Sequence, residues 1–222
     1  MSLKSILAFC ICTTLSYTTM AASSNLDESI AEVGHRWAKI NYQTPDTEKE
    51  AAFNSLIVQV EQVSQSFPGK AEPLIWQAIV LSSAAKVEGG LGGLGKAKNA
   101  RDLLLTAERI SPAALNGSVY NSLGSLYSKV PGWPIGFGDK KKAKEYFDKA
   151  LAINPNGIDP NYFYGDLLAD QGEYARAVDF LRRALGAPPR PGREDADIGR
   201  RQEVSRLLES IKSKHGDELA SK

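Results

Sequence analysis

The sequence predicts an all-α protein, a solenoid of about four helical hairpins with a further helix capping its C-terminal end. One apolar phrase recurs: a small residue, a bulky apolar residue four positions on, an alanine three further on, and then a proline. No segment alternates apolar and polar residues between hairpin turns, so we expect no sheet. The three clear copies are Ala100, Leu104, Ala107, Pro112; Ala143, Phe147, Ala150, Pro155; and Ala177, Leu181, Ala184, Pro189.

Each copy of the phrase predicts one helix and its end. Offsets of four and seven residues place the three apolar positions on one helical face, and a proline five residues further cannot continue the helix. Upstream of each copy lies a second helical stretch, with a small residue where the two helices must touch: Ala78, Gly124 or Gly165. A fainter copy precedes them at Leu56, Val60, Val63 and Pro68.

The last hairpin carries the most specific pattern. Gly165 precedes Ala177 by twelve residues, and Gln171 to Tyr174 form a tight turn between antiparallel helices. This unit resembles a tetratricopeptide repeat, and the resemblance extends over residues from about 28 to 191. It implies that the first helix of each pair lines a concave face that binds a partner. We therefore expect a solenoid over residues 26–191, and a C-terminal capping helix and tail over residues 192–222.

Two hairpins carry glycine-rich insertions between their helices, at residues 88–95 and 130–139. In the second insertion Trp133, Ile135 and Phe137 supply more apolar surface than an ordinary loop does. These side chains either fold back onto the solenoid, which we favour, or line a ligand pocket. The expected helices span residues 26–42, 48–67, 72–87, 95–110, 113–129, 139–153, 159–170, 174–185 and 194–214, the last with an apolar stripe of Ile198, Val204, Leu207, Leu208 and Ile211.

The first residues predict a secretory signal. Lys4 precedes an apolar run from Ile6 to Leu15, and small residues follow it, so residues 1–22 are expected to be removed on export to the periplasm. Both cysteines, Cys10 and Cys12, lie in this signal. Neither follows the small residue typical of a lipoprotein signal. We expect a soluble mature chain without disulfides and without a membrane span.

Charge and motifs argue against several classes of function. The chain has 27 basic and 26 acidic residues, which is not the footprint of a nucleic-acid-binding protein. Gly90, Gly95 and Lys96 match part of a phosphate-binding loop, but Ala97 stands where Ser or Thr is needed. The two histidines lack the partners of a metal site, and no nucleophile elbow occurs. We predict no enzyme activity, no cofactor and no metal.

The resemblance implies which side chains face the groove. Asp159, Asp166 and Asp170 make an anionic peptide tail unfavourable there, so a neutral or basic segment, or a partly apolar small molecule, fits better. Asp166 and Asp170 are expected to form a solvated or groove-lining acidic face rather than catalytic carboxylates. The predicted binding residues are Ile75, Ile79, Asn121, Ser125, Lys129, Tyr162 and Asp166, together with Trp133 and Phe137 of the insertion.

We predict a non-catalytic scaffold that uses the groove and the aromatic insertion to engage a protein partner in the cell envelope. A second interpretation is a small-molecule carrier with a pocket bounded by Trp133, Ile135 and Phe137. The segment from Gly138 to Phe147, with the insertions, also resembles the periplasmic T component of tripartite substrate transporters. That resemblance implies a helical accessory subunit that assembles with a substrate-binding protein.

Overall fold

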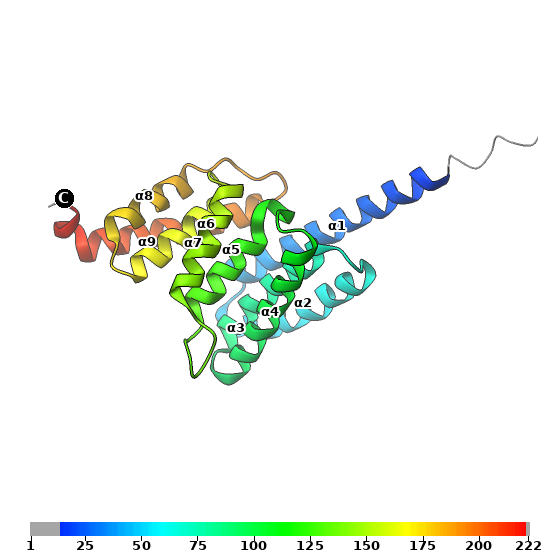
Figure 1. The fold of residues 1–222 in the computed structure, drawn as a ribbon, viewed down its shortest axis with the longest axis horizontal. Helices are drawn as coiled ribbons and strands as arrows, with labels where there is room; N and C mark the ends of the chain where they lie inside the picture. Colours follow the sequence, from blue (N-terminus) through cyan, green and yellow to red (C-terminus); the bar gives the residue numbers. More distant parts are fainter. Residues whose placement is uncertain (1–13, 221–222) are drawn as a thin grey trace, which may run out of the picture.

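The computed structural model describes residues 14–220, with side chains from residue 25 except 217, 218 and 220, and the described part contains nine helices and no strand (Figure 1). Most of the predicted signal therefore lies outside the described residues. The helices are α1 Thr14–Gln43, α2 Asp46–Ser66, α3 Ala71–Glu88, α4 Gly90–Ile110, α5 Ala114–Lys129, α6 Lys140–Ile153, α7 Ile158–Asp170, α8 Tyr174–Leu185 and α9 Glu194–Ala220.

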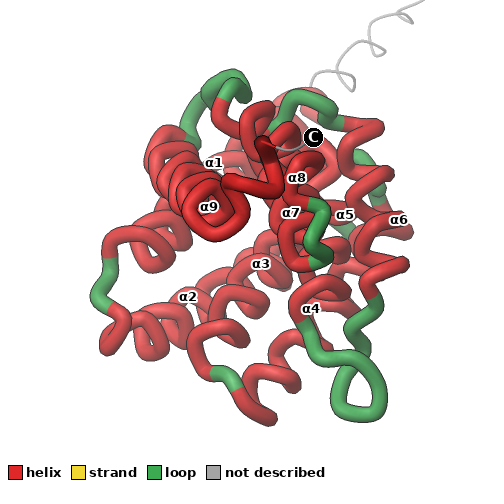
Figure 2. The backbone as a smooth tube through the Cα atoms, turned by 90° about the vertical axis from the view of Figure 1, so that its left-hand side faces the viewer, coloured by secondary structure: helices red, strands yellow, loops and turns green. Residues whose placement is uncertain are grey.

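Consecutive helices pack as antiparallel hairpins, α1 with α2, α3 with α4, α5 with α6 and α7 with α8 (Figure 1). This confirms the predicted solenoid. The phrase that predicts the second helix of each hairpin also marks the core, because Leu104, Phe147 and Leu181 are each wholly buried. The helix α9 packs against α8 and α7 and also returns to α1, beside which Figure 2 shows it end-on.

Glycine allows close contact between helices at the predicted positions. A Cβ atom added at Gly124 of α5 would lie 2.6 Å from the ring of Phe147 on α6. A Cβ atom at Gly165 of α7 would lie 3.0 Å from Leu181 on α8. At these two positions a side chain of the neighbouring helix fills the space that a β-carbon would need, and glycine is therefore required for close packing.

The first insertion is not the loop that its glycines predict. Helix α4 begins at Gly90, so the glycine-rich stretch forms its first turns. The reason is close packing on α3, since a Cβ atom at Gly93 would lie 2.5 Å from the carbonyl oxygen of Ala85. This excludes a phosphate-binding loop here: the segment is helical, α3 precedes it, and Lys96 is ion-paired with Glu88.

The capping helix α9 differs from its predicted stripe at one position. Val204 and Ile211 are buried and Leu207 and Leu208 pack against the core, as expected, but Ile198 is exposed. The buried residues near that end of α9 are Ala196, Asp197, Gly199 and Arg200, because the helix meets α1 and α7 there through small and charged residues.

Candidate functional site

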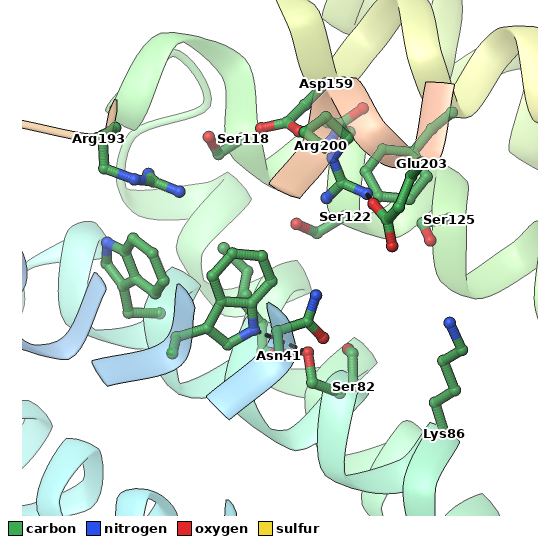
Figure 3. A pocket seen from close by; sticks show the side chains of 16 residues that line it. Asn41, Ser82, Lys86, Ser118, Ser122, Ser125, Asp159, Arg193, Arg200 and Glu203 are labelled. Carbon is green, nitrogen blue, oxygen red and sulfur yellow. Dashed lines mark hydrogen bonds and ion pairs between the residues drawn. The ribbon is translucent and has the colours of Figure 1, made fainter. Parts of the chain in front are cut away.

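The concave face holds a cavity of about 180 Å³ that is lined by the first helix of each hairpin and by the C-terminal helix. Its lining comes from α1, α3, α5 and α7, together with Arg193 and α9, and from none of the second helices. A hollow of about 510 Å³ adjoins it and shares Asn41, Ser83, Lys86 and Glu203. We call the cavity and this hollow the groove; Figure 3 shows the side chains of the cavity.

One wall of the groove is aromatic. Trp37 of α1 and Trp76 of α3 meet edge to face, with ring centroids 6.1 Å apart, and the indole of Trp37 donates a hydrogen bond to Ser83 Oγ at 2.8 Å. Phe163 of α7 also lines the cavity, and the guanidinium of Arg200 lies 4.5 Å from the centroid of its ring. These rings offer apolar surface with fixed orientation.

The remaining surface of the groove is largely neutral and polar. Asn121 is 9% exposed, and its buried side-chain oxygen has no hydrogen-bond partner among the described residues. Ser122 and Ser125 follow it along α5 and point into the cavity (Figure 3). Buried polar atoms without a partner are uncommon in folded proteins, so Asn121 marks a place where a ligand can complete a hydrogen bond. The serines of the lining are Ser82, Ser83, Ser118, Ser122 and Ser125.

The acidic groups of the cavity, Asp159 and Glu203, are paired with arginines. Asp159 Oδ2 accepts from Arg190 Nη1 at 2.6 Å, and its Oδ1 accepts from Arg200 Nε at 2.8 Å. Burial alone would raise the pKa of Asp159, but the attraction of Arg190 and Arg200 outweighs it and holds the pKa well below its usual range. Arg200 also forms an ion pair with Glu203, and Glu203 accepts from the Tyr42 hydroxyl at 3.3 Å.

Two cations of the cavity, Arg193 and Lys86, lack an ion pair among the described residues. The guanidinium of Arg193 lies 4.8 Å from the Trp76 ring, and its buried Nε has no hydrogen-bond partner. Burial, and the repulsion of Arg190, lower the pKa of Arg193. Lys86 points into the groove from α3 (Figure 3). Asp159, one of the aspartates from which the sequence predicts that the groove disfavours anionic peptides, is therefore paired with arginines. The unpaired charge of the cavity is positive.

The structure places three of the predicted binding residues in the cavity, namely Ile79, Asn121 and Ser125. Ile75 is wrong as a groove residue, since it is wholly buried between helices and cannot touch a partner. The guanidinium of Arg200 lies over the ring of Tyr162, 4.7 Å from the ring centroid. Burial raises the pKa of Tyr162 to about 12.

Lys129 and Asp166 bind each other away from the cavity. Lys129 Nζ lies 2.7 Å from Asp166 Oδ2 and 2.7 Å from Asp170 Oδ2. Burial would lower the pKa of Lys129, but the hydrogen bonds that it donates to both carboxylates raise the pKa above its usual value. This ion-pair cluster joins the ends of α5 and α7, so neither acidic group is a free groove carboxylate.

The aromatic insertion neither folds back completely onto the solenoid nor forms a ligand pocket. Phe137 folds back, with its ring 5.4 Å from that of Tyr127 and the Arg101 guanidinium 4.6 Å from its centroid. Trp133 and Ile135 are 90% and 65% exposed, and neither lines a described cavity. A ligand pocket bounded by these three side chains is therefore wrong for this structure.

Trp133→Ala is expected to change the free energy of unfolding by no more than about 0.5 kcal/mol, because an exposed ring gives up no packing. Phe137→Ala is the matched comparison and is expected to cost about 1 to 3 kcal/mol through loss of its ring contacts. Urea denaturation of both variants measures the difference. Equal destabilisation by the two substitutions would show that Trp133 is packed.

Sequence reasoning misses the C-terminal side of the groove. The binding residues predicted from the sequence include none of Arg190, Arg193, Arg200 and Glu203. Arg190 and Arg200 reach Asp159 across 31 and 41 residues, and Glu203 accepts from Tyr42 of α1, so no local pattern signals these pairs. No helix among the described residues has the length and apolarity to cross a membrane, and no cluster of metal-binding side chains occurs within the same part of the chain.

Comparison with known proteins finds a family match over one part of the chain. Residues 135–193 match the tetratricopeptide repeat family. No curated protein matches the sequence. Among solved structures, a thermophilic tetratricopeptide repeat protein of Thermus thermophilus is 18% identical, with 71% of this chain and 91% of that chain covered and a TM-score of 0.42.

Proposed function

We propose that this chain, whose residues 135–193 match the tetratricopeptide repeat family, is an exported, non-catalytic scaffold whose groove holds a segment of a protein partner in the cell envelope. The supporting observation is the buried, unpartnered oxygen of Asn121 beside Ser122 and Ser125. An extended peptide offers backbone N–H groups at regular intervals, which is what such an acceptor and neighbouring hydroxyl groups bind.

The groove suits one segment rather than a flat interface. Trp37 and Trp76 provide an apolar wall for a side chain, while the polar residues of α5 face the backbone of the bound segment. The unpaired Arg193 and Lys86 favour a segment that is neutral or negatively charged. The sequence predicts a neutral or basic segment instead, because it does not reveal that the aspartates are paired.

Site-specific photo-crosslinking tests this proposal. A photoreactive side chain at Ser125, in the groove, is expected to capture one partner in cells, whereas the same group at Val58, exposed on α2, is not. A synthetic peptide of the captured segment is expected to bind the full chain, and Asn121→Leu to weaken that binding about tenfold through loss of the amide hydrogen bond. Equal capture from both positions, or no weakening by Asn121→Leu, would contradict the use of the groove.

Export is tested separately by mass spectrometry of the chain from a periplasmic fraction. We expect the recovered protein to lack residues 1 to about 22, the length of a secretory signal. An intact N-terminus in the cytoplasm would contradict export and leave the groove proposal standing.

A small-molecule carrier is the second candidate, and one observation favours it. The groove contains an aromatic wall and an unpartnered amide next to a hollow of about 510 Å³, within the range of pockets for small ligands. Native mass spectrometry of gently purified protein distinguishes the two, since a stoichiometric bound molecule is expected only for a carrier.

A further inference from the structure

The two insertions lie against each other at one end of the molecule. A Cβ atom at Gly136 of the second insertion would lie 3.4 Å from Leu94 of the first, and Phe137 stacks beneath Arg101 further along α4. Figures 1 and 2 both show the loop between α5 and α6 at the same end as the turn between α3 and α4. We call this end the insertion tip: residues 88–95 and 130–139.

The most exposed large apolar side chains of the described chain are all at the insertion tip. Trp133 is 90% exposed, Leu91 is 85% exposed and Ile135 is 65% exposed. Single exposed apolar residues are normal on a protein surface. Here three exposed apolar side chains lie on two segments that touch each other. None of the three is buried in the core, so they do not contribute to the stability of the fold.

Lysines surround the insertion tip. Lys140, Lys141 and Lys142 open α6 immediately after the second insertion and are exposed. Lys98 is exposed one helical turn beyond Leu94 on α4. Positive charge at a helix N-terminus opposes the helix dipole, so this run does not serve the stability of α6, whose capping is provided by Asp139.

The acidic residues near the insertion tip are mostly occupied. Glu88 pairs with Lys96, Asp102 pairs with Arg101, and Asp139 accepts the backbone N–H groups of the first turn of α6. Lys98, Lys141 and Lys142 have no ion pair among the described residues, while Glu145 is an unpaired acidic group on α6. The surface around the apolar side chains is therefore positive.

We propose that the insertion tip docks on an anionic membrane surface, with Trp133, Ile135 and Leu91 entering the interfacial layer and the lysines facing lipid headgroups. Tryptophan is favoured at the boundary between headgroups and hydrocarbon. Lysine is depleted in protein–protein interfaces, yet it attracts anionic lipid. The combination of a protruding tryptophan with unpaired lysines therefore fits a bilayer better than a second protein. This attachment is independent of the groove.

Acrylamide quenching of tryptophan fluorescence tests the docking in the full chain. Trp37 and Trp76 line the groove but are only 6% and 2% exposed, whereas Trp133 is 90% exposed, so quenching reports mainly on Trp133. With mixed phosphatidylcholine–phosphatidylglycerol vesicles we expect Trp133 to become protected and its emission to shift to the blue, and with phosphatidylcholine alone much less. High salt is expected to weaken the effect, since the attraction is screened. This readout is specific to the tip even if residues 1–22 also bind lipid.

Vesicle co-sedimentation of variants assigns the contribution of each side chain. Trp133→Ser is expected to lower the binding constant about tenfold, and Lys141→Gln about fivefold on anionic vesicles only. Ile198→Ser and Lys212→Gln are matched controls, since Ile198 is 61% exposed and Lys212 is exposed without an ion pair among the described residues, both on α9. The controls are expected to bind as the unaltered chain does.

Two results would overturn the proposal. One is a chain that sediments with vesicles while Trp133 stays accessible to acrylamide. The other is protection of Trp133 that rises with protein concentration without lipid, which would make the insertion tip an interface between copies of the chain.

Discussion

Replacing Asp159 by alanine is expected to lower the free energy of unfolding by about 2 to 3 kcal/mol, less than the full cost of breaking a buried ion pair, because the site is part-buried and each arginine keeps a second carboxylate. The carboxylate holds Arg190 and Arg200, and only 9% of the Arg200 side chain is exposed. Without Asp159, two guanidinium groups remain close together with less compensating charge. Urea denaturation at about pH 7 measures the loss, because the free energy extrapolates linearly to water.

Asp148→Ala is the matched control, since its ion pair with Lys144 lies on the surface, with 53% of the Asp148 side chain exposed. It is expected to cost about 0.5 kcal/mol or less. A loss from Asp159→Ala as small as that of the control would show that the arginine pairs add nothing to stability.

The same pair makes stability depend on pH. The pKa of Asp159 is lower in the folded state than in the unfolded chain, so its contribution is fully present above the unfolded value, about 4. It is lost as the pH falls from there toward the depressed folded value. We expect the unaltered protein and Asp148→Ala to lose stability below about pH 4 more steeply than Asp159→Ala does. Parallel pH profiles of all three would contradict the depressed pKa.

Gly124→Leu is expected to destabilise the protein by about 1 to 3 kcal/mol through overpacking. Even a β-carbon at this position would lie 2.6 Å from the ring of Phe147, and that ring is wholly buried and has little room to move. Thermal and urea denaturation measure the change. Phe147→Leu in the Gly124→Leu background is expected to recover part of the loss by freeing space.

Gly95→Leu is the control for this substitution. Nothing lies within 4 Å of a β-carbon at Gly95, which is exposed on α4. Leucine also has a higher helix propensity than glycine, so this variant is expected to be unchanged or more stable. Gly124→Leu at or above the stability of the unaltered protein would contradict the close contact of α5 with α6.

Local patterns in the sequence predict most of the fold. The spacing of Ala143, Phe147 and Ala150 is set by the helical period, so it specifies both a helix and its buried face. The glycine-rich start of α4 is different, because glycine has low helix propensity and Gly93 is helical only through tertiary contact with Ala85. Packing that no local pattern reveals overrides propensity there.

The helical period also makes part of the groove predictable from the sequence. Asn121 and Ser125 lie one turn apart on the first helix of a repeat, so their common face follows from the period of the helix. Ile75 occupies the corresponding register on α3 but is buried. The arginines of the C-terminal side depend on how α9 returns across the concave face, and that path is a property of the whole solenoid.

The contact between α9 and α1 has a consequence for the order in which the chain folds. His35 lies 3.1 Å from Asp195, and Ala196 is buried in the same core as Trp37 and Trp76. Hairpins form from neighbouring residues, but this contact joins positions 160 residues apart and must await nearly the whole chain. A chain that emerges from its N-terminus therefore presents the aromatic wall uncovered until its last helix arrives. The concave face is completed by the final step of folding.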